Sequence, residues 1–199
     1  MGSPALTVAI LAGGAATRLG GRDKGLEPAG GKALVEWVIA YAKQSMRDAE
    51  LIVIANRHHD DYARYAPTHA DVVPGFQGPL AGVATALRVA KAPSLLTLPV
   101  DCPAPPDDLV KRLRSAMRHA RVQSVVAHDG VRRQPLFALY RRDLAESAHL
   151  AAEQGQGVHQ WQDAIGAVEV DFADRRQQFH NLNTPEDFAA YADAVRSRD

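Results

Sequence analysis

The sequence predicts an α/β fold, in which a mostly parallel sheet carries helices on both faces. Apolar, strand-like runs alternate with helix-like segments along the chain. Two of these runs, Leu51–Ala55 and Ser94–Val100, are almost continuously apolar, which is typical of strands buried on both faces. The length of 199 residues suits one domain.

The first half of the chain starts with a short apolar run that predicts a strand. The spacing of Leu34, Trp37, Val38 and Tyr41 predicts an amphipathic helix after the Gly30-Gly31 turn. Pro79 suits the first turn of a later helix. The expected strands are Leu6–Leu11, Leu51–Ala55, Ala70–Val73 and Ser94–Val100, and the expected helices are Ala33–Met46, His58–Tyr65 and Leu80–Ala90.

The second half continues the alternation and adds a hairpin. Asp129-Gly130 is a hairpin turn signal between two strands. Thr184 is the expected N-cap of the last helix, with Pro185 at its first position. The expected helices are Leu109–His119, Asp143–Glu153, Val158–Ala164 and Glu186–Val195, and the expected strands are Gln123–His128, Gln134–Tyr140 and Ala167–Phe172.

Composition excludes several classes of protein. Lys and Arg together number 23, as do Asp and Glu, so no overall basic field attracts nucleic acid or an anionic membrane. One cysteine, Cys102, excludes an intrachain disulfide and a cysteine-based zinc site. Neither a signal peptide nor a membrane span is visible. We therefore expect a cytoplasmic protein that binds neither nucleic acid nor a membrane.

The loop Leu11–Lys24 is the first candidate site. It holds the glycine pairs Gly13-Gly14 and Gly20-Gly21, interleaved with Arg18, Arg22 and Lys24. Glycines let backbone N–H groups approach an anion, and cations add charge for phosphate oxygens. The dinucleotide and P-loop motifs are both absent. The loop therefore predicts a different kind of phosphate site; the alternative is a flexible connection with solvated cations.

Three polar residues near predicted strand ends extend this site. Asp101 follows a buried strand, where open α/β sheets bind ligands, and a lone carboxylate among phosphates suits Mg²⁺. Its alternative role is to cap the following helix. Asn56 and Asp71 could hold a base edge or ribose hydroxyls, although from position alone a turn residue is the favoured interpretation of each.

Other polar clusters carry weaker signals. His58-His59 lacks the spacing of a metal motif, so solvated residues at a helix start are the favoured interpretation. Arg132, Arg133 and Gln134 could form a polar patch beside a second substrate, but from spacing alone a solvated hairpin is the favoured interpretation. No nucleophile elbow is present.

The segment LAGGAATRLGGRDKGL resembles the signature of Mg²⁺-dependent nucleotidyltransferases, most closely the molybdenum cofactor guanylyltransferases. Similar segments recur in order along nearly the whole chain: IANR with Asn56, GPLAG at 78–82, PVDCP at 99–103, QPLFALY at 134–140 and NLNTPED at 181–187. The resemblance implies a three-layer, Rossmann-like sheet of about seven strands. It also implies one nucleotidyltransferase domain over 1–199, with about 5–120 binding the nucleotide and about 121–199 the acceptor.

The resemblance also implies roles for single residues. Arg18, Lys24 and Asp101 are the implied catalytic residues, with Arg18 and Lys24 on the phosphates and Asp101 on Mg²⁺ and the phosphate region. The implied nucleotide-binding residues are Leu11, Ala12, Gly13, Gly14, Lys24, Asn56, Asp71, Gly78 and Asp101. Asn181, Asn183 and Gln134 are implied on the acceptor side.

The implied reaction transfers GMP from GTP to the phosphate of molybdopterin and releases pyrophosphate. GTP and molybdopterin are then the partners, with transient contacts to other cofactor-biosynthesis proteins or target apoenzymes. One alternative is a related cytidylyl-, sugar-phosphate or phospholactate nucleotidyltransferase. Another is a GTP-binding protein without transfer activity. Loss of Asp101 or Lys24 would mark that second alternative, and both residues are present.

Overall fold

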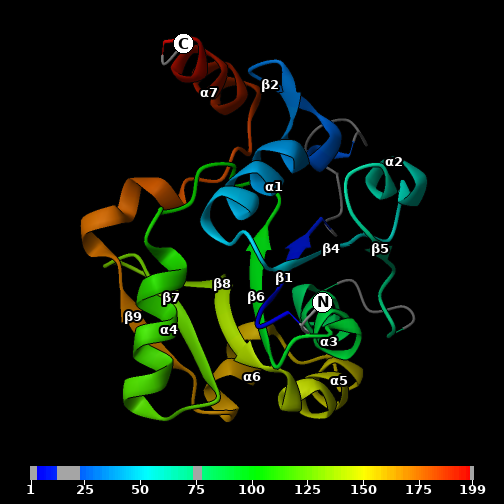
Figure 1. Ribbon diagram of the computed structural model, residues 1–199, viewed down its shortest axis with the longest axis vertical. Helices are drawn as coiled ribbons and strands as arrows, with labels where there is room; N and C mark the ends of the chain where they lie inside the picture. The colour runs from blue at the N-terminus through cyan, green and yellow to red at the C-terminus, as the bar shows by residue number, and fades with distance from the viewer. Residues whose placement is uncertain (1–3, 13–22, 74–77, 198–199) are drawn as a thin grey trace.

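The computed structural model describes residues 4–12, 23–73 and 78–197. Its centre is a seven-stranded sheet with the order β5-β4-β1-β6-β8-β7-β9 (Figure 1). The strands are β1 (Thr7–Leu11), β4 (Glu50–Ile54), β5 (Thr68–His69), β6 (Ser94–Pro99), β7 (Ser124–His128), β8 (Arg133–Arg141) and β9 (Val168–Asp171). The predicted fold class, an α/β protein with a mostly parallel sheet, is confirmed.

Strand direction determines where the loops gather. β1 pairs in parallel with β4 and β6, and β7 pairs in parallel with β9. β8 is antiparallel to both of its neighbours, β6 and β7. The other six strands therefore run the same way, and their carboxyl ends lie at one edge of the sheet.

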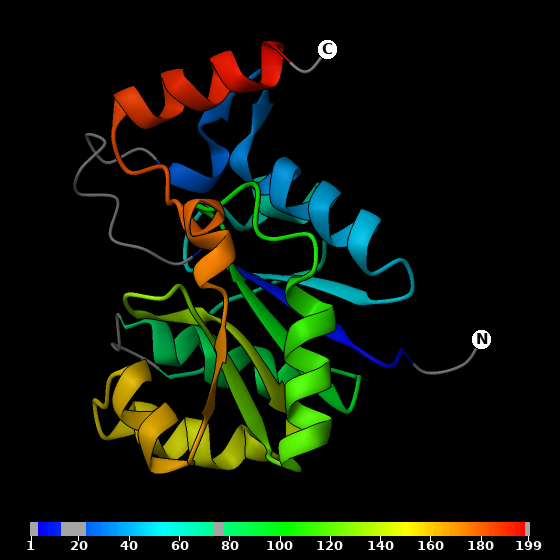
Figure 2. The same ribbon diagram turned by 90° about the vertical axis from the view of Figure 1, so that its left-hand side faces the viewer.

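Helices cover both faces of this sheet (Figure 2). They are α1 (Leu34–Ser45), α2 (His59–Ala63), α3 (Pro79–Val89), α4 (Leu109–Ala120), α5 (Ala145–Glu153), α6 (Val158–Ala164) and α7 (Pro185–Arg196). One buried cluster joins the sheet to α1, α2 and α4, and a second joins it to α3, α5 and α6. Within the described part of the chain, no helix is both long and apolar enough to cross a membrane.

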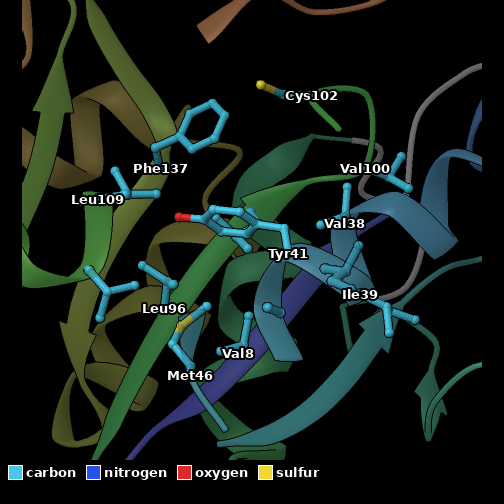
Figure 3. Close-up of a cluster of buried hydrophobic side chains, with 14 of the residues drawn as sticks. Val8, Val38, Ile39, Tyr41, Met46, Leu96, Val100, Cys102, Leu109 and Phe137 are labelled. Carbon is cyan, nitrogen blue, oxygen red and sulfur yellow. The ribbon is translucent and has the colours of Figure 1, made fainter. Parts of the chain in front are cut away.

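The first cluster shows how apolar spacing becomes packing (Figure 3). Val8 of β1, Leu96 of β6, Val38 of α1 and Leu109 of α4 are all fully buried in it. The hydroxyl of Tyr41, on α1, donates to the Pro106 carbonyl at 2.8 Å. Apolar burial of this kind is the main favourable term in folding, and the Tyr41 bond satisfies the polar atom that is buried with it.

A small two-stranded sheet lies beside α7, outside the main sheet. β2 (Pro28–Ala29) and β3 (Lys32–Ala33) flank Gly30 and Gly31, whose φ values are +58° and +84°. Such φ values favour glycine, which confirms the predicted turn. Ala29 and Leu34 pack there against Leu182 and the α7 residues Phe188 and Tyr191. The carboxyl-terminal helix is thereby held beside the segment that follows the glycine loop.

The predicted element boundaries agree with the structure to within two residues, with one exception. The strand predicted at Ala70–Val73 is wrong, because β5 covers Thr68–His69. Backbone N–H groups of Val53 and Ala55 pair with the carbonyls of Pro67 and His69, which places the pairing earlier in the chain. Val73 is buried against the α3 side of the sheet without being part of a strand.

The described residues also include three 3₁₀ turns. They are η2 (Lys24–Leu26), η3 (Arg142–Leu144) and η4 (Ala173–Phe179). η2 follows the glycine loop and carries Lys24, and η4 follows β9 at the carboxyl edge of the sheet.

Candidate functional site

The candidate site lies where the sheet changes the direction of its connections. From β1 the chain passes through α1 to β4 on one side, and later through α3 to β6 on the other side of β1. α1 and α3 cover opposite faces. In open α/β sheets, ligands bind outside the carboxyl ends of the strands at such a point. The loops after β1 and β6 are therefore the expected binding loops.

Lys24 joins three distant parts of the chain at this point. Its Nζ donates to Asp101 Oδ2 at 2.9 Å and to Asn183 Oδ1 at 2.7 Å. The Lys24 and Asp101 side chains are 23% and 22% exposed, so a ligand can still reach both. The Leu182 N–H also donates to the Asp101 carbonyl at 2.8 Å. The structure thus brings together two predicted phosphate-side residues and one predicted acceptor-side residue.

Asp23 and Tyr62 fix the turn that carries Lys24, and sequence reasoning missed both. Asp23 is the N-cap of η2, and its Oδ1 accepts the Gly25 N–H at 3.0 Å. The same oxygen accepts a short hydrogen bond from the hydroxyl of Tyr62, a fully buried residue of α2. The only local signal was an aspartate before a glycine-containing turn; nothing near Tyr62 in the sequence indicated its partner.

Asn56 and Asp71 form a reciprocal pair at the ends of β4 and β5. The Asn56 side-chain amide donates to Asp71 Oδ2 at 2.7 Å, and the Asp71 N–H donates to Asn56 Oδ1 at 2.8 Å. Burial raises the pKa of the Asp71 carboxyl, and the bond from Asn56 opposes that shift. Asp71 Oδ1 is buried, and no described group donates to it. An unsatisfied buried acceptor suits an N–H donor from a ligand.

Asp101 is the candidate metal ligand of this site, and the groups around it decide which metal it suits. Among the described residues, no three histidine, cysteine, aspartate or glutamate side chains gather around a point that would hold a metal. Of the two carboxylate oxygens of Asp101, only Oδ2 accepts a hydrogen bond from a described residue. Mg²⁺ is usually bound by one or two carboxylates, with waters and substrate phosphates as its other ligands. A single carboxylate at the phosphate end therefore fits Mg²⁺ that arrives with a nucleotide.

The remaining predicted acceptor-side residues lie on different elements. Asn181 follows η4, and its Oδ1 is buried with no partner among the described groups. Gln134 lies on β8, where it is buried and donates to Asp129 Oδ2 at 2.6 Å. Among the described residues, Gln134 makes no hydrogen bond to Lys24 or Asp101. Arg133 beside it binds Asp163 and Glu169, so that side chain links β8 to α6 and β9.

The nucleotide-side predictions are placed as follows. Leu11 ends β1, and the Ala12 N–H donates to the Ile54 carbonyl at 2.9 Å. Gly78 is the N-cap of α3. Gly13, Gly14 and Arg18 lie outside the described residues. His58 is the N-cap of α2, with its Nδ1 3.6 Å from Asp61 Oδ2.

Comparison with known proteins gives matches over most of the chain. The family model described as "MobA-like NTP transferase domain" matches residues 8–168. A molybdenum cofactor guanylyltransferase of Shewanella sp. (strain MR-4) is 41% identical over 179 residues, which is 89% of this chain and 90% of that protein. One from Mannheimia succiniciproducens is 38% identical over 181 residues, covering 89% of this chain and 94% of that protein.

A solved structure has a similar fold. The molybdopterin-guanine dinucleotide biosynthesis protein A of Archaeoglobus fulgidus superposes with a TM-score of 0.77. The match covers 97% of this chain and all of the other, at 24% sequence identity.

Proposed function

This chain belongs to the family of MobA-like NTP transferase domains, and we propose that it transfers GMP from GTP to the phosphate of molybdopterin. A phosphate oxygen of the acceptor attacks the α-phosphorus of GTP, the P–O bond to the β-phosphate breaks, and pyrophosphate leaves. The observation that carries the proposal is the meeting of Lys24, Asp101 and Asn183 at the switch point of the sheet. It puts a cation, a carboxylate and an acceptor-side amide in one place.

The charges at this site suit two anionic substrates. The nucleophile is already an anion near neutral pH, so the reaction needs no strong general base. Lys24 is held where it would neutralise phosphate charge, a stabilisation that grows as charge develops on the leaving group. When bound at Asp101, Mg²⁺ supplies further neutralisation of the phosphates. We assign Arg18 to the same task and the backbone of Gly13 and Gly14 to phosphate contact.

The Asn56–Asp71 pair supports the assignment of the base. Asp71 Oδ1 is a buried acceptor that no described group satisfies, and guanine offers N–H donors on its Watson–Crick edge. Cytosine presents one donor, the N4 amino group, beside the acceptors N3 and O2, whereas guanine presents the adjacent donors N1–H and N2–H2. A carboxylate acceptor therefore favours guanine. We therefore propose that Asp71, oriented by Asn56, contributes to the choice of GTP. Leu11, Ala12 and Gly78 would line the same nucleotide site.

The two halves of the chain supply separate groups of loops, one for each substrate. We propose one nucleotidyltransferase domain, in which about 5–120 binds the nucleotide and about 121–199 binds the acceptor through Asn181, Asn183 and Gln134. A single sheet that runs through both parts supports this arrangement. A reaction that consumes GTP also fits a cytoplasmic location.

A pyrophosphate-release assay with GTP, Mg²⁺ and molybdopterin tests the proposal, with CTP and ATP in parallel. We expect turnover with GTP, and a kcat at least about a hundredfold lower for Asp101→Asn or Lys24→Ala. Lys91→Ala is the matched control for Lys24, because Lys91 pairs with Glu50 at the start of β4, away from the carboxyl edge. Faster turnover with CTP would make the chain a cytidylyltransferase. GTP binding without pyrophosphate release would mean that the chain is a GTP-binding protein without transfer activity.

A further inference from the structure

A cavity lies at the same edge of the sheet, and none of the roles above uses it. It is a cleft of about 630 Å³ between the β7–β8 turn and η4. This volume lies within the range of small-molecule sites. Its lining includes Asp129, Val131 and Arg132 from the turn, and Arg176, Phe179 and His180 from η4 and the residue after it.

Strand direction puts this cleft on the side of Asp101. The β7–β8 turn follows His128 at the carboxyl end of β7, and η4 follows Asp171 at the carboxyl end of β9. His128 and Asp171 are paired in register. Both strands run parallel to β6, whose carboxyl end leads to Asp101.

Two contacts tie one wall of the cleft to the Asp101 turn. Cys102 Sγ donates to the Gln178 carbonyl at 3.3 Å, and the Leu182 N–H donates to the Asp101 carbonyl at 2.8 Å. Between these contacts the chain runs from Gln178 to Leu182, and the next residue, Asn183, binds Lys24. A ligand in the cleft can therefore extend along this segment toward the phosphate end of the site.

The cleft has cationic groups whose hydrogen-bonding capacity is not used up. Among the described residues, the Arg176 guanidinium has no hydrogen-bond or ion-pair partner. Arg132 is 73% exposed, and its only ion-pair contact with a described residue is a distant one of 3.9 Å to Asp129. Guanidinium groups hydrogen-bond ring carbonyls and anionic groups through a planar fork. The cleft thus offers two such forks to a ligand.

The carboxylate of Asp129 does not counteract these cations, because the protein already uses it. Its Oδ1 accepts the N–H groups of Val131 and Arg132, both at 2.8 Å, and its Oδ2 accepts from Gln134 at 2.6 Å. Burial raises the pKa of Asp129, but these bonds outweigh it and lower the pKa overall. Asp129 thus remains ionised at neutral pH and shapes the turn.

Apolar groups give the cleft a surface for a flat ring. Phe179 lines the cleft with the 3% of its surface that is exposed, and its ring is held edge to face by Phe137 at 5.0 Å and Phe172 at 5.5 Å. Val131 at the turn is 62% exposed, which is unusual for an aliphatic residue of this protein. An apolar lining with a few convergent polar groups is the usual composition of a small-molecule site.

We propose that this cleft holds the heterocyclic end of the acceptor, while the acceptor phosphate reaches Asn183 and Lys24. The ligand class is a flat, nitrogen-rich bicyclic ring that carries a phosphate monoester on a side chain. Arg132 and Arg176 bind the polar edge of the ring or an anionic substituent on it, and Phe179 and Val131 contact its apolar surface. The inference rests on the proposed function, because it names the subsite for the second substrate of that reaction.

The test compares Arg132→Ala, Arg176→Ala and the double variant with the unsubstituted protein, using purified molybdopterin as the probe. Each single change should raise the Kd for molybdopterin about tenfold, measured by equilibrium dialysis, because a hydrogen bond to a charged group is lost. KM for molybdopterin should rise in parallel, and the Kd for GTP should change less than about twofold. Arg176→Lys should keep part of the affinity, because it restores the charge without the fork.

Arg175→Ala is the matched control. Arg175 adjoins Arg176, is exposed, and pairs with Asp174 outside the cleft. Acceptor affinity in the cleft variants equal to that of Arg175→Ala would overturn the cleft assignment, while GTP-dependent turnover in the unsubstituted protein would leave the proposed function standing. Absence of turnover and of molybdopterin binding in the unsubstituted protein would overturn both.

Discussion

Tyr62 shows how much a single buried hydroxyl can determine. It donates to the carboxylate that also caps the turn of Lys24. Burial raises the pKa of the Tyr62 hydroxyl, and the neighbouring Asp23 carboxylate raises it further. The hydroxyl therefore stays protonated at every working pH and always acts as the donor. The position of Lys24 therefore depends on the Tyr62–Asp23 hydrogen bond as well as on its own bonds to Asp101 and Asn183.

Replacement of Tyr62 by phenylalanine should loosen this turn. A buried bond to a carboxylate is lost, so the free energy of unfolding should fall by about 1–3 kcal/mol. We expect kcat for pyrophosphate release to fall while KM for molybdopterin changes little. Urea denaturation and steady-state kinetics measure the two effects. Tyr65→Phe is the control, because Tyr65 is only half-buried and its pKa is raised by burial and then by the carboxylate of Glu36, not that of Asp23. Equal kinetics in both variants would remove Tyr62 from the positioning of Lys24.

Gly25 is constrained by the same tyrosine. A Cβ at this position would lie 2.9 Å from Val100 Cγ2 and would overlap the Tyr62 hydroxyl oxygen. Gly25→Ala should therefore cost about 1–3 kcal/mol of stability, because core atoms must shift. Thermal or urea unfolding measures the loss. Gly157→Ala places its Cβ in open space and should cost much less; if the two variants were equally stable, the crowding around Gly25 would have no energetic effect.

Single residues at strand ends were predictable, and contacts between distant segments were not. Asp101 and Asn56 follow apolar runs, so their side of the sheet could be inferred before any coordinates. Lys24 and Asn183 are 159 positions apart, and only tertiary packing makes them neighbours. From the sequence, Tyr62 is indistinguishable from an ordinary residue on the apolar face of a short helix. Its polar partner, 39 positions away, leaves no local signal.

At the scale of elements, the start of α7 connects helix capping to the site. Thr184 and Asp187 form a capping box. The sequence predicted Thr184 as the N-cap. Asp187 Oδ2 accepts the N–H of Asn183 at 2.8 Å and the N–H of Thr184 at 2.9 Å. The cap of the helix therefore also holds Asn183, the partner of Lys24.

This cap gives a prediction for acid pH. The N–H of Asn183, followed by that of Thr184, lowers the pKa of Asp187 to about 2. Because the folded-state pKa is depressed, the ionised carboxylate stabilises the cap fully when the pH is above about 4, the ordinary pKa of an aspartate. This contribution is lost as the pH falls through about 2. NMR titration should find a midpoint near 2 for Asp187. Protection of the α7 amides from hydrogen exchange should decline over the same window.

Asp187→Asn supplies the control for that titration. Asparagine keeps an oxygen acceptor but has no charge, so the low-pH loss of α7 protection should shrink or disappear. A decline of the same size in this variant would assign the acid sensitivity to other groups. Acceptor affinity should also fall in Asp187→Asn, because Asn183 is held less firmly.

Helices with a clear apolar spacing were predictable from the sequence. The positions of short strands depend on the strands with which they pair. The spacing within α1 and the cap of α7 are local signals, and both predictions are confirmed. β5 has only two residues, and its place follows from pairing with β4 rather than from the apolar residues after it. The β2–β3 hairpin is equally short, so only its glycine turn could be foreseen.

At the scale of the whole molecule, one antiparallel strand organises the second half of the site. Because β8 reverses direction, β7 and β9 return to the orientation of β6, and their carboxyl-end loops join those of the nucleotide half. Alternation along the sequence predicted the class of sheet. It did not predict the strand order, which depends on how all the helices pack, and so the cleft beside η4 could not be foreseen.

The contact between Lys24 and Asn183 also bears on how the protein is made. Domains form from the amino terminus onward during synthesis, and contacts between distant segments form late because long loops must close first. A nascent chain that holds β1 and η2 must wait for 159 further residues before this contact is possible. Lys24 can thus emerge from the ribosome long before its partner Asn183. Maturation of the site is consequently expected to be a late event, after most of the sheet has assembled.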